Sequence, residues 1–464
     1  MKEIIRKDTI CAISTPLGKS GIGIVRLSGK KSIKIAGKVF LAKNKKKPSR
    51  FRSHTIHYGH IVDPSEKYKI VDEILLTVMK SPNTYTKEDI AEINCHGGIA
   101  SLKKILDIVL KEGARLADPG EFTMRGFLNG RIDLAQAEAV NDVINAKTEA
   151  SLKAAVSQLE GGLSTPIKNL RNSMFDILTD MEAQLDFSEE EISYCDHVSF
   201  LKRLQKQDDQ LKKIIKTEDL GALLRDGLSC VICGKPNAGK SSLLNAMLRR
   251  KRAIVTHLPG TTRDTIEENI QINGIPVRII DTAGITSTKN IIEKEGVKRS
   301  RYQIKNADLV IFVLDASKKY SRKDEEILKI IKTKKKVVVV NKIDLKTKLD
   351  LKKAQKKTKG KIIPLSVRKN KNLNLLLKEI QHIISIGNDC HPEASFLTSR
   401  RHKNNLEKTQ KSLKHAIKQL KKGTSYEAIS VDLSECVKYL GYIIGCSVEP
   451  DMLKSIFSKF CIGK

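Results

Sequence analysis

Five short apolar runs between residues 227 and 385 restrict the possible folds of this chain more than any other feature. They read "SCVICG", "VRIIDTAG", "DLVIFVLD", "KVVVVNKID" and "KIIPLSV", and helical stretches alternate with them. The runs are rich in β-branched residues and lack regular polar alternation, which is typical of strands buried on both faces. Residues 227–385 are therefore predicted to form an α/β domain with a parallel sheet between two layers of helices.

The segments on either side of this block have different patterns. Residues 1–131 mix strands with one clear helix, whose apolar face runs from Ile99 to Leu110. The strands are expected in "GIGIVRLSG" (21–29), "HTIHYGHIVD" (54–63), "VDEILLTVMK" (71–80) and "DIAEINCHG" (89–97). Residues 132–226 and 386–464 both have helical spacing. The simplest architecture is a multidomain α/β protein: an α+β domain, then a helical bundle into which the α/β domain is inserted.

One helix is predicted to run through "DLAQAEAVNDVINAKTEASLKAAVSQLEGG", because its apolar positions keep helical spacing to the end. Gly161 and Gly162 are expected to end it, and Pro166 lies near the start of the next helix.

Composition indicates a polyanionic partner. The 464 residues include 85 Lys and Arg against 53 Asp and Glu, a net charge of +32, which favours nucleic acid over a membrane surface. Most of the excess is Lys, so an AT-rich coding bias is the alternative explanation. Nine scattered cysteines indicate a reducing setting. Because no run of 18 apolar residues and no signal-peptide pattern is found, the expected location is the cytoplasm, without a membrane association.

Cys230 and Cys233 have the spacing of a redox or zinc pair, but they lie inside the apolar run "LSCVICG". Residues three apart on a strand point to opposite faces, so the two thiols are predicted to diverge into the core.

A phosphate-binding loop is predicted at "GKPNAGKS" (234–241), between a strand and a helix. Gly234 and Gly239 allow the backbone N–H groups to approach phosphate oxygens, and Lys240 neutralises charge on the β and γ phosphates. Ser241 is expected to place its hydroxyl on Mg²⁺.

Three further segments follow strands in the order expected of a guanine-nucleotide site. In "DTAG" (281–284), Asp281 is expected to hold Mg²⁺ through water and the Gly284 amide to sense the γ-phosphate. In "NKID" (341–344), the Asp344 carboxylate can accept hydrogen bonds from N1 and the exocyclic amine of guanine, which adenine does not offer as donors. "SVR" (366–368) can supply an amide to the guanine carbonyl. The sequence therefore predicts GTP binding.

The group that orients water for hydrolysis is not evident from these motifs. Many small GTPases have Gln directly after D-x-x-G, but here that residue is Ile285. Either another residue supplies the function or hydrolysis is slow. Thr262 in "PGTTRD" is the candidate Mg²⁺ ligand, and Asn237 is either a ligand for a monovalent cation or a turn residue.

Together these motifs resemble the MnmE (TrmE) family of tRNA-modifying GTPases over essentially the whole chain. The resemblance includes "GIGIVRLSG", "YTKEDIAEINCHGG", "DPGEFTMRGFLNGRIDLAQAEAV", "GKPNAGKSSLLNA", "GTTRD" and the terminal "FCIGK". It implies a folate-binding domain (1–131), a helical domain in two parts (132–226 and 386–464) and an inserted G domain (227–385).

The resemblance also implies roles for residues of the G domain. Glu293 would orient the attacking water, Ser241 and Thr262 would bind Mg²⁺, and two G domains would dimerise across their nucleotide faces. K⁺ would be held by Asn237, Thr256, Leu258 and Thr261. The residues expected around GTP are Asn237, Ala238, Gly239, Lys240, Ser241, Ser242, Thr256, His257, Leu258, Pro259, Gly260, Thr261, Thr262, Asp281, Thr282, Ala283, Gly284, Asn341, Lys342, Ile343, Asp344, Ser366, Val367 and Arg368.

In this family a homodimer works with a flavoprotein, MnmG, in a heterotetrameric or larger complex that uses FAD and NADH. The complex adds an aminomethyl or carboxymethylaminomethyl group to carbon 5 of the wobble uridine in certain tRNAs. A 5-formyl- or methylene-tetrahydrofolate would supply the carbon, bound by Arg26, Glu92, Arg131 and Lys464. Cys461 is either a catalytic thiol or a wall of the folate pocket.

Two other functions are compatible with the nucleotide motifs alone. A ribosome-assembly or RNA-binding GTPase would carry the same loops, but no RNA-binding domain is recognisable after residue 390. The other alternative is a GTP-binding protein that hydrolyses GTP very slowly, and only Ile285 supports it.

Overall fold

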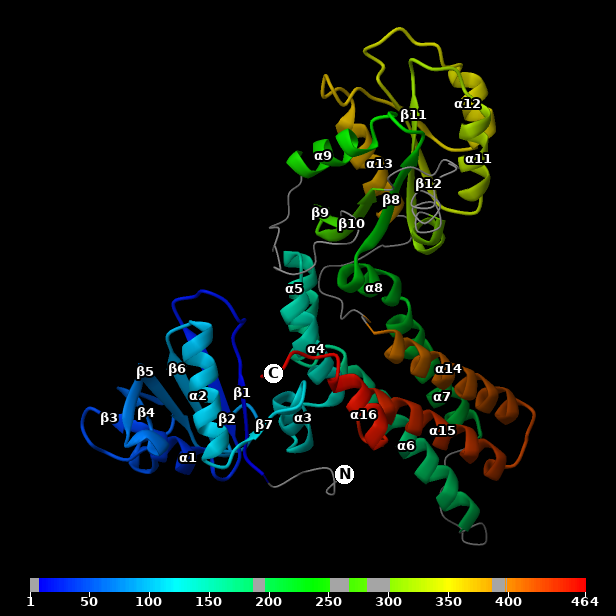
Figure 1. The fold of residues 1–464 in the computed structure, drawn as a ribbon. Coiled ribbons are helices and arrows are strands. Elements are labelled where there is room, and N and C mark those ends of the chain that lie inside the picture. The colour runs from blue at the N-terminus through cyan, green and yellow to red at the C-terminus, as the bar shows by residue number, and fades with distance from the viewer. Residues whose placement is uncertain (1–7, 187–196, 251–266, 282–300, 386–396, 398) are drawn as a thin grey trace. The chain divides into compact units, whose positions relative to one another are not determined.

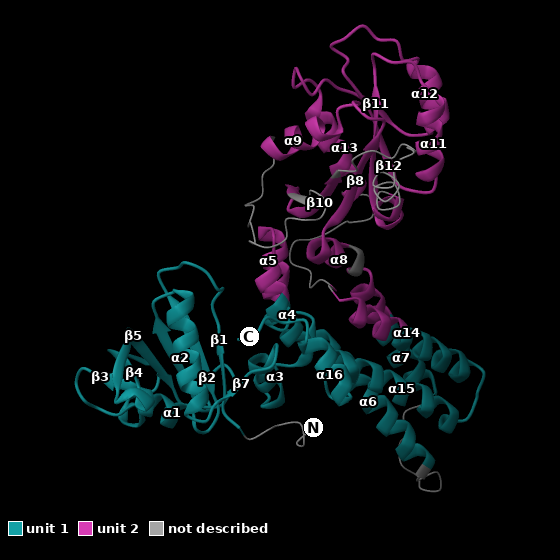
Figure 2. Ribbon diagram, viewed as in Figure 1, with its two compact units in different colours: residues 1–141, 158–208, 408–464 teal, residues 142–157, 209–407 magenta. Residues whose placement is uncertain are grey.

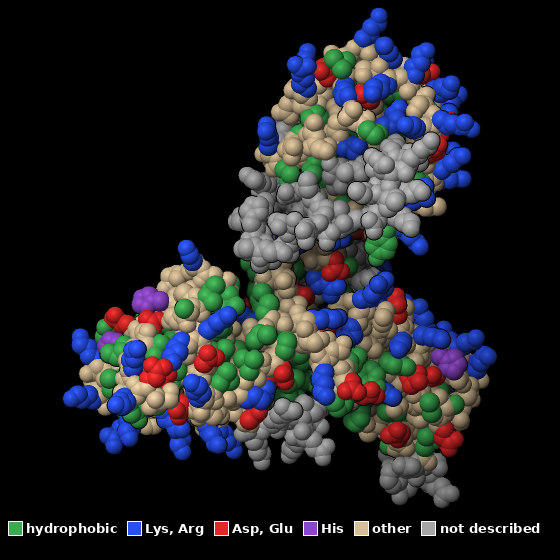
Figure 3. Space-filling view, in the orientation of Figure 1, with side chains coloured by type: hydrophobic (Ala, Val, Ile, Leu, Met, Phe, Trp, Pro, Cys, Tyr) green, Lys and Arg blue, Asp and Glu red, His purple; other side chains and the backbone are tan. Residues whose placement is uncertain are grey.

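The computed structural model describes residues 8–186, 197–250, 267–281, 301–385, 397 and 399–464 (Figure 1). The chain divides into two compact units (Figure 2). Unit 1 comprises residues 1–141, 158–208 and 408–464, and unit 2 comprises residues 142–157 and 209–407. Lys and Arg side chains are spread over the visible surface of both units (Figure 3). No helix in the described ranges is long and apolar enough to cross a membrane.

A mixed seven-stranded sheet forms the N-terminal part of unit 1. Its strands lie in the order β3 (Phe40–Ala42), β4 (Thr55–Asp63), β5 (Lys69–Met79), β6 (Ile90–Cys95), β2 (Gly23–Ser28), β1 (Ile10–Ile13) and β7 (Arg115–Leu116). Only β1 and β7 pair in parallel among these strands. The four strands expected from the sequence are confirmed as β2, β4, β5 and β6.

Two helices cover one face of this sheet, α1 (Ser32–Val39) and α2 (Ile99–Lys111). Leu102 and Ile105 of α2 are fully buried in one apolar cluster with Val25, Leu27 and Ile93 of the sheet. The helix expected from Ile99 is thereby confirmed. Successive strand residues face opposite sides, so the residues between Val25 and Leu27 and on either side of Ile93 face away from the helices.

The remaining helices of unit 1 form a bundle. They are α3 (Glu121–Leu128), α4 (Leu134–Asn145), α6 (Ser164–Asp186), α7 (His197–Ile215), α14 (Arg400–Lys421), α15 (Tyr426–Ile444) and α16 (Pro450–Phe457), of which α4, α7 and α14 continue into unit 2. α6 and α15 pack side by side although the sequence between them includes most of unit 2. Both flanks of the α/β block therefore contribute to the same bundle, as predicted.

The single helix expected over residues 133–162 is wrong. The structure has α4 and then α5 (Glu149–Leu159), with a break at residues 146–148. Thr148 and Ser151 exchange hydrogen bonds there: Ser151 N donates to Thr148 Oγ1 at 3.1 Å, and Thr148 N donates to Ser151 Oγ at 3.0 Å. A hydroxyl that caps a helix N-terminus starts a new helix, and helical spacing of apolar residues does not reveal such a break.

Unit 2 is built on a six-stranded sheet. Its order is β13 (Ile362–Pro364), β12 (Lys336–Asn341), β11 (Leu309–Asp315), β8 (Leu228–Gly234), β10 (Ile275–Asp281) and β9 (Glu267–Ile272). All neighbours are parallel except β9, which pairs antiparallel with β10. The five strands predicted from apolar runs are present, and the multidomain α/β class is confirmed.

Helices cover both faces of this sheet. α9 (Lys240–Arg250) and α13 (Leu373–Ser385) pack with one face, and α11 (Arg322–Ile330) and α12 (Leu351–Thr358) pack with the other. α8 (Glu218–Asp226) leads into β8. Cys230 and Cys233 belong to the apolar clusters on opposite faces, so the predicted divergence of the thiols is confirmed. Burial raises the pKa of the Cys233 thiol to about 12, which makes it inert as a nucleophile near neutral pH.

Candidate functional site

The phosphate-binding loop connects the end of β8 at Gly234 to the start of α9 at Lys240. Gly239 has φ +95°, and a Cβ there would lie 2.2 Å from Nδ2 of Asn341, so only glycine fits. Asn237 is exposed and has φ +62°, a left-handed conformation that Asn tolerates better than most residues. The loop is thus shaped by close packing against β12 and by unusual backbone angles.

Asn341, the last residue of β12, ties this loop to the segments expected to recognise the base. Its Nδ2 donates to the Ala238 carbonyl at 3.0 Å, while its Oδ1 accepts from the backbone N–H of Lys342 at 2.8 Å and of Val367 at 3.2 Å. The side chain is buried, at 3% exposure. The Asn341 side chain therefore connects the phosphate-binding loop with "NKID" and "SVR".

Two lysines lie beside the loop. Lys342 Nζ donates to the Asn237 carbonyl at 2.6 Å and forms a 2.7 Å ion pair with Asp315, the last residue of β11. Burial alone would raise the pKa of Asp315, but hydrogen bonds from Lys342 and Ser317 hold it below its usual value. Lys240 is buried and donates to the Lys235 carbonyl at 3.1 Å across the loop. The cation expected to meet phosphates therefore lies within the curve of the loop.

Asp344 is positioned by Ser366, whose hydroxyl donates to the carboxylate at 2.6 Å. This hydrogen bond is the main cause of an Asp344 pKa below its usual value. The same hydroxyl accepts from Lys369 N at 3.2 Å. "NKID" and "SVR" are thus brought together, and the charged form of Asp344, which can accept two hydrogen bonds from a guanine edge, is favoured.

Several residues expected at the nucleotide lie outside the described residues. They are Thr256, His257, Leu258, Pro259, Gly260, Thr261, Thr262, Thr282, Ala283, Gly284 and Glu293. Asp281 ends β10, in register with Ile232 of the neighbouring parallel strand β8. The ends of β8, β10 and β12 thus place the starts of three motifs on one edge of the sheet, together with Asp315 at the end of β11.

One group of side chains in unit 1, called the cationic pocket, consists of Arg26, Glu92, Tyr85 and Arg131 on the side of β2 and β6 opposite to α2. Arg26 and Glu92 are directly paired residues of these strands, and Arg26 Nε forms a 2.7 Å ion pair with Glu92 Oε1. The Arg26 guanidinium also lies 5.8 Å from the ring centres of Tyr85 and of Phe122. Contacts of this kind between a cation and aromatic rings are favourable.

Arg131 joins this pocket through Tyr85. Its guanidinium lies 4.4 Å from the centre of the Tyr85 ring, and the Tyr85 hydroxyl is 2.9 Å from Thr123 Oγ1. Arg131 Nε is buried and has no hydrogen-bond partner among the described residues. Because a buried guanidinium N–H normally has an acceptor, this atom fits an anionic or polar ligand in the pocket.

The C-terminal tail reaches the same place. The Gly463 carbonyl accepts hydrogen bonds from Arg26 Nη1 at 3.3 Å and Ser14 Oγ at 3.2 Å, and Gly120 N donates to the Cys461 carbonyl at 3.4 Å. α16 delivers the tail, because Leu453, Phe457 and Phe460 are buried in one apolar cluster. Cys461 is exposed, and Lys464 follows Gly463 directly.

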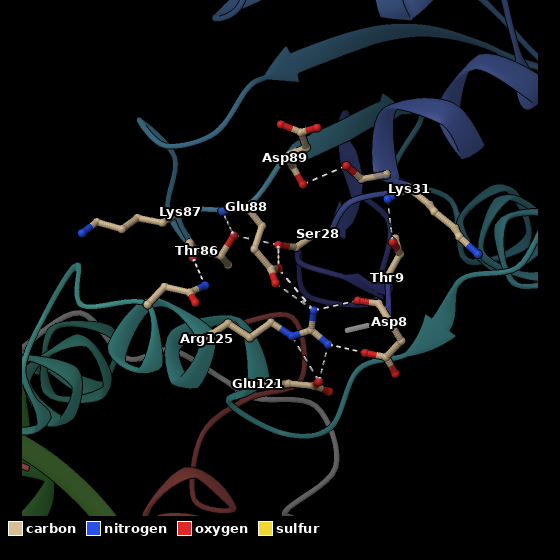
Figure 4. A network of polar contacts seen from close by, with 12 residues as sticks. Asp8, Thr9, Ser28, Lys31, Thr86, Lys87, Glu88, Asp89, Glu121 and Arg125 are labelled. Carbon is tan, nitrogen blue, oxygen red and sulfur yellow. Dashed lines mark hydrogen bonds and ion pairs between the residues drawn. The ribbon is translucent and has the colours of Figure 1, made fainter. Parts of the chain in front are cut away.

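A buried ionic network around Arg125 includes residues adjacent in sequence to the cationic pocket (Figure 4). Arg125, 3% exposed, forms ion pairs with Asp8 at 2.6 Å, Glu121 at 2.9 Å and Glu88 at 3.2 Å. Glu88 accepts a 2.7 Å hydrogen bond from Ser28, which lies two residues from Arg26 on β2. Thr86, which follows Tyr85, is 2.7 Å from the same Ser28 hydroxyl. The network therefore connects Ser28, which follows Arg26 on β2, with Thr86, which follows Tyr85.

Two family models match the chain. The MnmE helical domain matches residues 134–461, and the GTP-binding protein TrmE N-terminus matches residues 9–131. The tRNA modification GTPase MnmE of Alkaliphilus oremlandii is 46% identical over 98% of this chain and 99% of its own length. This chain belongs to the MnmE family of tRNA modification GTPases.

Two further comparisons give the range of similarity. MnmE of Bacillus subtilis is 41% identical over 98% of this chain and 100% of its own length. A variant of Aquifex aeolicus Era bound to GDP·AlF4⁻ is 28% identical, and the match covers 40% of this chain and 66% of the Era chain. Its TM-score of 0.28 is too low to support a structural argument. The MnmE assignment therefore depends on the full-length relatives and the family models.

Sequence reasoning missed three residues that organise these sites. Tyr85 is the first residue of "YTKEDIAEINCHGG", and its ring lies near both Arg26 and Arg131. An aromatic residue in a segment that contributes to a site rich in Arg was a usable signal. Asp315 ends a predicted strand at the same sheet edge as Asn341 and was overlooked because it belongs to no nucleotide motif. Gly120, which pairs with the tail, gave no signal, because only the fold brings residues 120 and 461 together.

Proposed function

We propose that this member of the MnmE family hydrolyses GTP and takes part in adding an aminomethyl or carboxymethylaminomethyl group to carbon 5 of the wobble uridine in certain tRNAs. The observation that carries the proposal is that the C-terminal tail meets Arg26 in a cationic pocket of the same chain that holds the nucleotide motifs. A nucleotide switch alone does not require such a pocket.

The nucleotide site would act as follows. Lys240 would neutralise phosphate charge, Asp344 would select guanine, and Glu293 would orient water in place of the missing Gln. Mg²⁺, held by Ser241 and Thr262, would supply charge stabilisation at the phosphates. K⁺, held by Asn237, Thr256, Leu258 and Thr261, would supply a second positive charge when two G domains meet. Asn237 is exposed within the phosphate loop, so its side chain is accessible to a cation.

The cationic pocket would bind a reduced folate that supplies the one-carbon unit. Arg26, Arg131 and Lys464 suit the carboxylates of a folate, and the Glu92 carboxylate suits the donor edge of its pterin. The buried Arg131 Nε without a partner among the described residues supports a polar ligand there. Cys461 is proposed as a catalytic thiol next to this pocket.

The proposed assembly is a cytoplasmic homodimer that works with an MnmG-like flavoprotein carrying FAD and using NADH. Beyond contacts between G domains, exposed apolar side chains of β4 and β5, on the face of the unit 1 sheet opposite to α1 and α2, support self-association. Ile56, Tyr58 and Leu75 lie on this face at 64%, 43% and 44% exposure, and Tyr58 and Leu75 are paired across β4 and β5. Exposed apolar side chains gathered on one sheet face are typical of an interface.

The division into a folate-binding domain (1–131), a helical domain (132–226 and 386–464) and an inserted G domain (227–385) belongs to the same proposal. It agrees with the ends of the two family matches near residue 131.

Nucleoside mass spectrometry of tRNA from cells that lack this protein tests the main proposal. Wobble uridines should lose their carbon-5 aminomethyl-type groups, and the wild-type gene should restore them. Normal wobble uridines in the deletion strain would contradict the proposal and favour a ribosome-assembly or other RNA-binding GTPase.

GTP turnover tests the nucleotide chemistry separately. Turnover should be faster in KCl than in NaCl at equal ionic strength, and Glu293→Ala should lower turnover at least about tenfold without a matching loss of GTP affinity. Equal rates in the two salts would contradict the role of K⁺. Unchanged turnover in Glu293→Ala would assign the water-orienting role to another residue.

A further inference from the structure

Half of the net charge of this protein lies in one short segment of unit 2. Residues 316–371, between the end of β11 and the start of α13, contain 21 Lys and Arg against 5 Asp and Glu. The resulting +16 is carried by 56 residues, whereas the whole chain of 464 carries +32. A uniform coding bias toward Lys would spread the charge evenly, so this concentration needs a local explanation.

The fold gathers much of this charge on one surface. We define the basic surface by its exposed side chains, Lys318, Lys319, Arg322, Lys323, Lys346, Lys348, Lys352, Lys353 and Lys356. The loop after β11 and the loop after β12 are joined, because Lys348 N and Leu349 N both donate to the Ala316 carbonyl, at 2.8 and 3.1 Å. Figure 3 shows Lys and Arg gathered where Figure 1 places α11 and α12.

The two helices of the basic surface are held side by side. Lys357 of α12 forms an ion pair with Glu325 of α11, and its ammonium group lies 5.0 Å from the centre of the Tyr320 ring. α12 turns Ala354 and Thr358 inward, and its four lysines are exposed. The surface is therefore a fixed array of cations and not a flexible tail.

Four of the five carboxylates in the segment bind other groups, and the fifth, Glu326, is exposed on α11. Asp324 is buried and binds Lys235 at 2.6 Å, Glu325 binds Lys357, and Asp344 accepts from Ser366. Asp350 caps the N-terminus of α12. In contrast, Lys346, Lys348, Lys352, Lys353 and Lys356 form no side-chain ion pair with any described residue.

We propose that the basic surface binds the phosphate backbone of an RNA, which is a tRNA if the proposed function holds. Close cations on a rigid surface release counterions when they meet a polyanion, and this gain is the main source of affinity for RNA. A membrane is the less suitable partner, because α12 uses its inward side against the sheet and has no free apolar face to insert. Lys346 of the basic surface lies two residues after Asp344, so bound RNA would lie next to the guanine-recognition loops.

The test compares two triple variants of the full chain that remove equal charge. K352Q/K353Q/K356Q alters the basic surface, and K45Q/K46Q/K47Q alters three exposed lysines of unit 1. Affinity for unfractionated tRNA is measured at several KCl concentrations. The first variant should bind at least about tenfold more weakly near 0.15 M salt, and its slope of log K against log salt should be shallower by about 2 to 3. The control should match wild type.

Three further measurements separate the possible causes. K352R/K353R/K356R keeps the charge and should bind like wild type, which excludes damage to α12 as the cause. GTP turnover should be equal in all variants, because none of these lysines belongs to the nucleotide site. Wild-type affinity and slope in K352Q/K353Q/K356Q, or an equal loss in the control, would overturn the proposal. If the wild-type gene failed to restore modified wobble uridines in deletion cells, the proposed function would be contradicted. The affinity measurements would still test the basic surface, because they do not depend on tRNA modification.

Discussion

The carbonyl of Gly463 accepts a hydrogen bond from the guanidinium of Arg26 at 3.3 Å, although 437 positions separate the two residues. The penultimate residue of the chain is thus held against the second strand of its first domain. The same guanidinium is paired with Glu92 and lies near Tyr85. Gly463 is therefore held next to Arg26, and the tail is not a loose end.

Gly463→Ala should displace the tail. Gly463 has φ +90°, and a Cβ there would lie 2.5 Å from the Ile13 carbonyl oxygen, so the tail must move. We expect the affinity for a reduced folate to fall at least about tenfold, measured by calorimetry, since each 1.4 kcal/mol is a factor of ten.

Gly423→Ala is the matched control for this experiment. Gly423 also has a positive φ, of +69°, but a Cβ there meets nothing within 4 Å. It should cost about 1 kcal/mol in stability through backbone strain and leave folate affinity unchanged. Equal loss of affinity in both variants would show that general strain, and not the position of the tail, is responsible.

Tyr85 should act through its ring. Tyr85→Leu removes the aromatic face near Arg26 and Arg131 and should weaken folate binding by about tenfold, since such contacts are worth about 0.5–2 kcal/mol. Tyr85→Phe keeps the ring and loses only the hydroxyl next to Thr123, so it should bind nearly as wild type. A loss in Tyr85→Phe as large as in Tyr85→Leu would assign the effect to the hydroxyl instead.

Asn341→Asp should loosen the phosphate loop. The substitution keeps an oxygen for the N–H groups of Lys342 and Val367 but replaces the donor to the Ala238 carbonyl by a second acceptor. Leaving a buried acceptor unpaired costs about 1–3 kcal/mol, so GTP affinity should fall by about ten- to a hundredfold. Equilibrium titration with a fluorescent GTP analogue measures this.

The control for Asn341→Asp is Asn404→Asp, which makes the same chemical change at an exposed position on α14. It should leave nucleotide affinity unaltered. If Asn341→Asp also bound as wild type, the Ala238 hydrogen bond would not be what holds the loop.

The sequence alone predicted most of what depends on local pattern. The strands β8, β10, β11 and β12 and the motifs at their ends follow from apolar runs, because the carboxyl ends of parallel strands meet at one edge of a sheet. The divergence of Cys230 and Cys233 followed from strand periodicity in the same way.

Features that depend on long-range or hydroxyl-mediated contacts were not predictable. The break between α4 and α5 is made by Thr148 and Ser151, which helical periodicity ignores. Arg125 is buried only because Asp8 and Glu88, from distant parts of the chain, converge on it. No pattern in one sequence indicates which acidic residues will meet one arginine.

The same ionic network gives a pH-dependent prediction. Burial alone would raise the pKa of Glu121, but hydrogen bonds from Arg115, Asp118 N and Arg125 hold it below its usual value. The pKa of Asp8 is also lowered, because Arg115 and Arg125 outweigh the opposing effect of burial. A carboxyl whose pKa is lower in the folded than in the unfolded chain adds stability above its unfolded pKa, and this stability is lost as the pH falls through the folded pKa.

Arg115→Gln should therefore make the N-terminal part of unit 1 sensitive to weaker acid. Without Arg115, which binds both Asp8 and Glu121 at 2.6 Å, both carboxyl pKa values rise, and the loss of stability begins at a higher pH. Hydrogen exchange of peptides that contain β1 and α3, measured on the full chain from pH 7 downward, should show opening at a higher pH than in wild type. At neutral pH the substitution should cost about 2 kcal/mol, as for hydrogen bonds to charged groups.

Lys38→Gln provides the comparison for this acid test, because it also removes one positive charge that is paired with a carboxylate, but on the surface. Lys38 binds Glu112 at 2.8 Å, but its side chain is 49% exposed, so water already screens the interaction. Its acid profile should overlay that of wild type. If Arg115→Gln and Lys38→Gln shifted the profile equally, net charge and not the buried network would control the acid stability of this sheet.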